Sequence, residues 1–357
     1  MPINIDGSKG IRQNTTEVTK IPVGTTAQRP ANPEAGMIRF NTDRGFVEWY
    51  DPITDIWSSV AFDVAAVATG GTVTDIEQDG KKFRVHTFTS SGTFEVTRGG
   101  NVDVLVVGGG GAGGVGRDSS SAHGGGGGGA GGLVFEQAKT LSTEAYNIVV
   151  GNGGIFSERY NSPAASENDG EDSIFDDITA IGGGAGATRT DGLGREGGSG
   201  GGATCCEEIG ASALQPNSPS GGFGNKGGDS STGASNVVEA GGGGAGEPGG
   251  DALALGGSYD GGDGLYFGEF FTNNFLQDGF FAGGGGPGCS ANLEIEPPGG
   301  IGGGGNGGQF ANPRTEGHSG TPNTGGGGGG GPSNTSGGNF PSGAGGSGIV
   351  IVRYRIG

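Results

Sequence analysis

The sequence has little of what catalytic and metal sites are built from. Its 357 residues include three cysteines and three histidines. Cys205 and Cys206 are adjacent and Cys289 stands apart. This arrangement matches neither a disulfide framework nor the spacing of a metal site. The histidines lack the spacing of a metal site or a catalytic triad: His86, His123 and His318. We therefore expect no enzyme activity, no catalytic residue, no cofactor and no bound metal.

Positive charge and long apolar runs are also scarce. Nineteen Lys and Arg stand against 38 Asp and Glu, and only Lys139 and Lys226 remain as lysines after residue 100. This net charge of −19 repels phosphate backbones, so we do not expect nucleic-acid binding. No run of apolar residues is long enough for a membrane span, and polar residues 1–20 lack the apolar core of a signal peptide. Synthesis in the cytoplasm fits these absences.

Glycine, in contrast, is present in large excess. The chain has 91 glycines, of which 11 fall in the first hundred residues. Ordering so much glycine costs backbone entropy, which raises the possibility of disorder. Against it stand 18 phenylalanines and runs of nearly pure glycine without the Ser, Lys and Glu of linkers. Collagen is excluded because no strict G-X-Y period exists. We expect an ordered glycine-rich domain.

The glycine runs predict an extended helix with three residues per turn, rising about 3.1 Å per residue without internal hydrogen bonds. Its N–H and C=O groups must be satisfied by neighbours, which can approach closely because glycine has no Cβ. Stacked runs would then form a hydrogen-bonded lattice with loops at alternate ends. The runs are 108–114, 124–132, 182–187, 197–202, 241–250, 283–288, 299–308 and 325–331.

Residues 21–60 predict a small aromatic β-hairpin module after a leader of residues 1–20. Strands are expected at Met37–Asn41, Phe46–Tyr50 and Ile56–Val60, with a turn at 42–45. Forty residues cannot bury a sufficient core alone, so we expect this module to oligomerise, as a trimer. The residues expected to serve assembly or attachment are Phe40, Phe46, Trp49, Tyr50 and Trp57.

This stretch resembles a small module of bacteriophage tail fibres and other virion proteins. The resemblance lies in I-P-x-G-T-T-A-Q-R-P-x-x-P-x-x-G-M-I-R-F-N-T-D, from Ile21 to Asp43, followed by an aromatic strand and Trp57. It implies attachment to other virion tail or fibre proteins, or fibre assembly, without catalysis.

Residues 61–85 are expected to be a connector, and 86–357 the glycine-rich domain. Residues 86–96 predict two short strands around Ser90–Gly92, while 101–107 and 347–356 predict buried strands that pair and close the domain. Further strands are expected at Tyr146–Val150 and Ile174–Ile181.

This part resembles the glycine-rich domains of phage adhesins and tail fibres. The matching pieces are HTFTSSGTF at 86–94, VDVLVVGGGGAGG at 102–114, YNIVVGNGG at 146–154, PNTGGGGGGG at 322–331 and GGSGIVIVRY at 345–354. The resemblance implies a sandwich of polyglycine II helices capped by short β-strands, with distal loops that recognise host receptors. The expected fold class is thus mostly β and irregular.

Gly108, Gly110 and Gly113 match G-x-G-x-x-G after a hydrophobic strand, as in dinucleotide-binding proteins. That site needs a helix that begins at the last glycine and holds the pyrophosphate at its N-terminus. Because more glycine follows here, no helix is expected and the motif is attributed to the lattice.

Seven aromatic residues crowd into Gly264–Phe281 and are the receptor-contact candidates: Tyr266, Phe267, Phe270, Phe271, Phe275, Phe280 and Phe281. They would bind a host glycan or outer-membrane protein. The alternatives are a hydrophobic plug at one end of the lattice or a contact between protomers. Loops 155–169 and 203–219 are further candidates.

Together these patterns predict a trimeric virion fibre protein that presents a glycine-rich domain to a host receptor and performs no chemistry. A structural collar, head or tail decoration or spacer protein is the alternative. An ice-binding protein is a third possibility, which the bulky aromatic loops disfavour.

Overall fold

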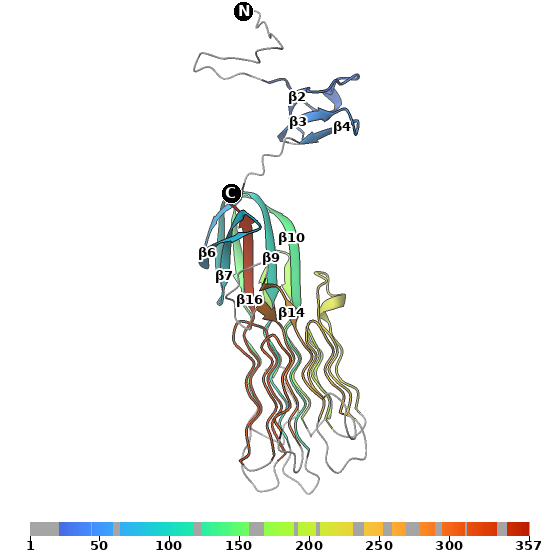
Figure 1. Cartoon of the computed structure of the whole chain (residues 1–357), viewed down its shortest axis with the longest axis vertical. Coiled ribbons are helices and arrows are strands. Elements are labelled where there is room, and N and C mark those ends of the chain that lie inside the picture. The colour runs from blue at the N-terminus through green and yellow to red at the C-terminus, as the bar shows by residue number, and fades with distance from the viewer. Residues whose placement is uncertain are drawn as a thin grey trace, which may run out of the picture. The chain divides into compact units, whose positions relative to one another are not determined.

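A computed structural model describes most of the chain and divides it into two compact units, Met1–Val64 and Ala65–Gly357 (Figure 1). The described residues are 21–43, 45–59, 65–116, 123–156, 168–188, 192–204, 208–230, 239–252, 259–268, 279–289, 295–310, 313–333 and 341–356. The two units are considered separately below.

The amino-terminal unit is a four-stranded sheet in the order β1-β2-β3-β4. Its strands are β1 (Val23–Gly24), β2 (Ile38–Asn41), β3 (Phe46–Asp51) and β4 (Ile56–Ser59). The three antiparallel strands β2, β3 and β4 confirm the predicted strands, and Gly45 takes the positive φ that the turn needs. The short β1 pairs parallel to β2 and was not predicted.

One face of this sheet is covered by the segment around the 3-10 helix Thr26–Gln28, and its interior is polar. Buried Glu48 accepts hydrogen bonds from Arg29 Nη2 at 2.6 Å and from Asn41 Nδ2 at 3.0 Å. Buried Arg39 donates to the carbonyl oxygens of Gln28 and Thr25. The Arg29 guanidinium holds the pKa of Glu48 below its usual value. The interior of this unit is therefore largely a charge network, with Tyr50 and Trp57 as its buried apolar side chains.

The second unit begins with two five-stranded sheets packed face to face. One has the order β10-β9-β16-β7-β6 and the other β13-β12-β11-β8-β5. The first consists of β6 (Thr72–Gln78), β7 (Lys81–Phe88), β9 (Gly100–Val107), β10 (Leu133–Leu141) and β16 (Ile349–Arg355). The second consists of β5 (Val67–Thr69), β8 (Gly92–Arg98), β11 (Ala145–Val149), β12 (Ser173–Phe175) and β13 (Ile178–Ala180).

The predicted pairing of the first and last long strands is confirmed, because β9 and β16 are antiparallel neighbours with Ile349 opposite Val107. Alternate residues of β16 serve two cores. Val350, Val352 and Tyr354 face the core between the sheets, whereas Ile349 and Ile351 face the glycine-rich side.

The expected connector at 61–85 needs correction. From residue 65 onward it forms β5, β6 and the start of β7, which belong to the two sheets. The alternation in Thr72–Gln78 is mostly polar because β6 is an exposed edge strand, so its sequence resembles a linker. The strands on either side of Ser90–Gly92 are both present, but β7 and β8 lie in different sheets.

The glycine runs pack around one central segment, residues 124–132. Each residue from Gly125 to Gly132 donates a backbone hydrogen bond to one of three neighbouring segments in turn, so the donors repeat every third residue. Gly125, Gly128 and Gly131, for example, all donate to carbonyl oxygens of the run 325–331. Three other segments donate to the carbonyls of the central segment, which gives it six neighbours: 108–116, 182–188, 198–204, 239–245, 283–289 and 325–333.

These six inner segments also bond to one another around the centre. Gly328 donates to Gly111 between the first and last of them, and Gly330 donates to Gly286. The ring is therefore closed, and each inner segment has its neighbours at hydrogen-bonding distance. A repeat of three residues with neighbours on all sides is the pattern expected of an extended three-residue helix.

Outer segments surround this ring, and their sequences are mixed. Some of them expose every third side chain to solvent, as in the exposed row Ile295, Pro298 and Ile301. The outer segments are 151–156, 168–172, 192–196, 208–213, 224–230, 249–252, 259–264, 295–300, 304–310, 315–320 and 341–347. We call the central, inner and outer segments together the glycine lattice.

The lattice has a sheet end and a far end (Figure 1). At the sheet end Gly108 follows β9 and donates to Gly132, which precedes β10. At the far end Gly114 donates to Gly126. Near the sheet end, Phe267, Phe281 and Ala282 pack with Leu105, Leu133 and Ile351 in a second apolar core. The strands thereby fix the register of the lattice segments that continue from them.

Substitution of a lattice glycine tests this packing. A Cβ built on Gly127 would collide with the carbonyl oxygen of Gly285, whereas a Cβ on Gly92 would lie 3.7 Å from the Phe88 ring. We expect Gly127→Ala to lower the unfolding free energy by about 2–3 kcal/mol or more. Gly92→Ala is the matched control and should change it by less than about 1 kcal/mol. Calorimetric unfolding of both variants measures the difference, and equal stabilities would contradict the packing.

A buried histidine makes the second unit sensitive to acid. His86 is fully buried, with Nδ1 2.7 Å from the Gly70 carbonyl oxygen and Nε2 3.1 Å from the Tyr354 hydroxyl. The neutral ring satisfies both contacts by donating from Nδ1 and accepting at Nε2. Burial lowers the pKa of His86, since the charged form loses its hydration.

The unfolding free energy should therefore be greatest above pH 6.5 and fall as the pH drops toward the lowered pKa of folded His86, by up to about 1.4 kcal/mol per pH unit. His86→Phe should be less stable at pH 7, because Gly70 and Tyr354 lose a partner, but should depend less on pH over this range. Denaturant unfolding at pH 7, 6 and 5 measures both slopes. Equal slopes would rule out His86 as the source.

Candidate functional site

The aromatic segment is divided between core and surface. Phe281 is fully buried and Phe267 nearly so, within the second apolar core, and the Phe267 ring lies 5.2 Å from that of Phe135. Buried rings cannot contact a receptor, so the expectation does not hold for these two residues. Tyr266 is 47% exposed and packs against Phe280, which is half-buried. Phe270, Phe271 and Phe275 lie outside the described residues.

The position of this segment favours the alternative interpretation, a plug at one end of the lattice. The short strands β14 (Leu265–Tyr266) and β15 (Phe280–Phe281) pair antiparallel and flank residues 267–279. Their buried rings contact residues of β9, β10 and β16, which places them at the sheet end. An aromatic cluster with glycine on both sides could be recognised from sequence, but its burial depends on the sheets.

The far end of the lattice carries exposed apolar residues. Ile155 and Phe156 precede residue 157, and their exposed fractions are 62% and 41%. Ile209, on the outer segment 208–213, is 71% exposed. Leu193 lies on the outer segment 192–196, and the β-bridge between Gly197 and Ala213 shows that these two segments are neighbours. Of the expected loop 203–219, residues 208–213 are thus a lattice segment, and 215–217 form a 3-10 helix at the sheet end.

Polar groups also meet at the far end. His123 Nδ1 lies 3.2 Å from an oxygen of Glu239, whose side chain is fully buried. Burial, with a smaller contribution from Glu239, raises the pKa of the Cys289 thiol to about 12. Cys289 is therefore a thiol at neutral pH and a poor nucleophile.

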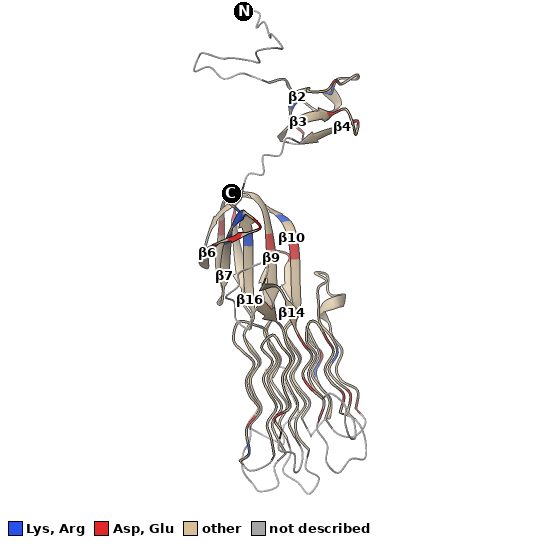
Figure 2. Ribbon diagram, in the orientation of Figure 1, with Lys and Arg blue, Asp and Glu red and all other residues tan. Residues whose placement is uncertain are grey.

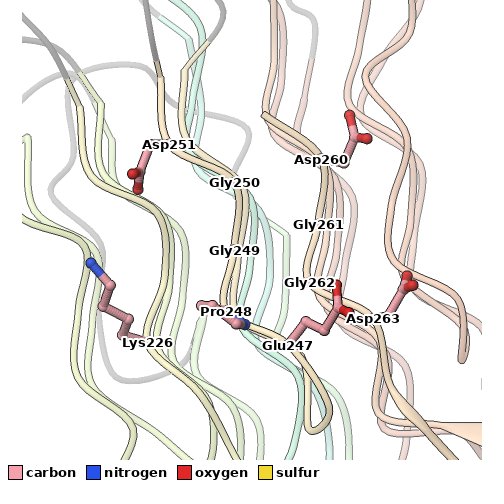
Figure 3. A pocket seen from close by; sticks show the side chains of 10 residues that line it. All are labelled: Lys226, Glu247, Pro248, Gly249, Gly250, Asp251, Asp260, Gly261, Gly262 and Asp263. Atoms are coloured by element: carbon pink, nitrogen blue, oxygen red, sulfur yellow. The ribbon is translucent and has the colours of Figure 1, made fainter. Parts of the chain in front are cut away.

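An acidic groove of about 400 Å³ lies on the outer surface of the lattice (Figure 3). Its charged lining comes from Lys226, Glu247, Asp251, Asp260 and Asp263. Part of this charge supports the lattice, because Asp263 accepts a hydrogen bond from the Ile301 N–H and Asp251 from the Asp229 N–H.

The one lysine in this groove, Lys226, is paired with Asp229, with Nζ 3.1 Å from Oδ2. The field in the groove is therefore negative and repels anionic ligands. Elsewhere along the described lattice charged residues are sparse (Figure 2).

The glycine motif that resembles a nucleotide site has no free donors. Residues Gly108 to Gly114 lie in an inner lattice segment, and each of them donates its N–H to a neighbouring segment. No helix follows within the described residues, as predicted. A phosphate would have no backbone N–H to bind here.

The other side chains with chemical potential are dispersed. His318 lies 3.8 Å from Glu296, and His86 is in the sheet core. Within the described ranges no group of three or more His, Cys, Asp or Glu side chains is placed to hold a metal ion. None of the described helices is long and apolar enough to cross a membrane.

The aromatic residues of the amino-terminal unit lie on two faces of its sheet. Tyr50 and Trp57 are buried beside the charge network, with ring centroids 5.7 Å apart, and half-buried Phe46 shares their face. Phe40 and Trp49 lie on the opposite, open face. The assembly candidates are thus two residues of an open face and three of a covered one.

Comparison with protein families agrees with this architecture. A family model described as a glycine-rich domain matches residues 87–355. The chain therefore belongs to the family defined by this glycine-rich domain. Among curated proteins no match is found.

Proposed function

We propose that this chain is a non-catalytic component of a bacteriophage virion, a tail-fibre or adhesin protein that presents the far end of its glycine lattice to a receptor on the host surface. It would be made in the host cytoplasm and carried on the particle as a homotrimer. The receptor would be a glycan or an outer-membrane protein, and neither nucleic acid nor a cofactor takes part.

The observation that carries this proposal is the difference between the two ends of the lattice. The sheets occupy one end, and at the other end lie the described segment ends that flank residues 117–122, 157–167, 189–191, 205–207, 231–238, 253–258, 290–294, 311–312 and 334–340. A rigid scaffold whose connections gather at one end suits recognition, because loops can vary while the scaffold is kept.

The exposed apolar residues beside these connections support a binding role. Ile155, Phe156, Leu193 and Ile209 are all at least 41% exposed. Exposed apolar side chains of this kind can contribute to an interaction surface. In the part of the lattice that the structure describes, backbone donors are used for packing, which supports a role without chemistry.

The amino-terminal unit supports the assignment to a virion. Its sequence from Ile21 to Asp43 resembles a virion module, and its fold has the predicted aromatic strands. Together with the separate glycine-rich unit, this favours attachment through the first unit and display by the second.

The proposal predicts a loss of adsorption when a far-end connection is replaced. In the particle that carries this chain, residues 157–167 are exchanged for Gly and Ser at equal length. We expect intact particles whose adsorption rate falls roughly tenfold or more, because a few contact residues are lost. Particle yield by electron microscopy and the adsorption rate constant are the measurements.

A matched control inserts the same Gly and Ser sequence between Asp79 and Gly80. This turn joins β6 to β7 at the end of the sheets away from the lattice, since Arg355 pairs with Phe83 there. Adsorption should be unchanged in the control. If neither the replacement of residues 157–167 nor that of the other far-end connections slowed adsorption, the receptor-binding role would be wrong. The role of a structural decoration or spacer protein would then take its place.

A further inference from the structure

In an ordinary small sheet the covered face is apolar, whereas the covered face of the amino-terminal unit is mostly polar and charged. The face covered by residues 25–29 holds Arg39, Asn41 and Glu48, all buried. Burial of charged groups contributes little net stability, because the ion pairs must offset their own desolvation. The covered face adds the buried rings of Tyr50 and Trp57, which is little hydrophobic burial for a unit of this size.

Six further apolar side chains lie on the opposite face, which nothing in this unit's described residues covers. Strand register places Val23, Phe40 and Val47 in one row across β1, β2 and β3. Ile38 and Trp49 form the next row, and Ile56 extends the face onto β4. Val23, Ile38, Trp49 and Ile56 are at least 40% exposed. We call these six residues the open apolar face.

The charges around this face decide which partner suits it. Asp51 is the charged residue that strand alternation places on the same side. Its carboxylate is held in the following turn, where it accepts hydrogen bonds from the Ile53 N–H and the Thr54 hydroxyl, both at 2.9 Å. These bonds lower the pKa of Asp51. The face thus offers apolar contact with a single carboxylate, which stays ionised but is held in the turn at the β3–β4 edge.

A second copy of the chain meets this requirement. With a net charge of −19, copies repel one another over most of their surface, whereas the open apolar face carries Asp51 as its one strand charge and so offers the contact with the least repulsion. A copy is also present whenever the chain is made, and a unit that cannot bury a core alone needs its partner in order to be stable.

We propose that the open apolar face is the self-association surface of this protein, buried against further copies of the same chain. This inference concerns the amino-terminal unit and does not depend on what the glycine lattice binds. It assigns the assembly contacts to Val23, Ile38, Phe40, Val47, Trp49 and Ile56, and it removes Tyr50 and Trp57 from them, since these two lie inside the unit.

The mass of the full chain in solution tests the proposal. One chain has a mass of 34.8 kDa, so light scattering after gel filtration should give a multiple of this value for the wild type. Ile38→Lys combined with Trp49→Lys should give 34.8 kDa, because lysines on facing copies repel. The matched control is Ile53→Lys, since Ile53 is 93% exposed in the turn outside the face, and it should keep the wild-type mass.

Tryptophan quenching tests the same face without added charge. The chain has two tryptophans, so Trp57→Phe leaves Trp49 as the reporter and Trp49→Phe leaves Trp57 as the buried reference. Trp49 is 40% exposed in a single copy, but when covered by another copy it should be quenched by acrylamide about as slowly as Trp57.

Two results would overturn the proposal. One is a wild-type mass of 34.8 kDa with Trp49 quenched severalfold faster than Trp57. The other is a wild-type multiple that the double lysine variant retains, since association would then use another surface. A folded glycine-rich unit in the double variant, judged by its calorimetric transition, shows that the change in mass arises at the face.

Discussion

Hydrogen bonding between backbones that carry no Cβ is the constraint on which the rest of this structure depends. In the central segment 124–132, eight consecutive residues donate to three neighbouring segments in turn, and three further segments donate back. Such contacts require the backbones to come so close that a Cβ at Gly127 would collide with the Gly285 carbonyl oxygen. The glycine content is therefore the condition for satisfying every buried backbone group in this packing, and not a sign of a flexible linker.

The sheets make this lattice specific. Glycine segments have no side chains with which to fix their register, so the register must come from their ends. At the sheet end Gly108 continues from β9 and Gly132 leads into β10, and Phe267 and Phe281 anchor the hairpin of β14 and β15 against the same sheet. The far end is then free to vary, which suits the display role that we propose. The amino-terminal unit follows a different rule: its interior is largely a charge network, and its apolar face is open.

Much of the inner lattice could be predicted from sequence, whereas most of its outer layer could not; of the outer segments, only those in the runs 241–250 and 299–308 were expected, and a turn at 301–303 interrupts the second run. The central segment and the six inner ones correspond to predicted glycine runs, because a segment with neighbours on all sides tolerates almost no side chain. Some outer segments expose every third side chain, so rows such as Ile295, Pro298 and Ile301 have the sequence of loops. The pairing of β9 with β16 followed from their matching apolar strands. The burial of Phe267 and Phe281 could not be predicted, because it is decided by sheets that are distant in sequence.

Amide hydrogen exchange of residues 124–132 in the full chain tests the central claim most directly. We expect the amides of residues 125–132 to exchange as slowly as those of β9 and β16, because each donates to a neighbouring segment inside a closed ring and opens only with the whole unit. Exchange at the rate of an unstructured chain in 124–132, with β9 and β16 still protected, would contradict the lattice.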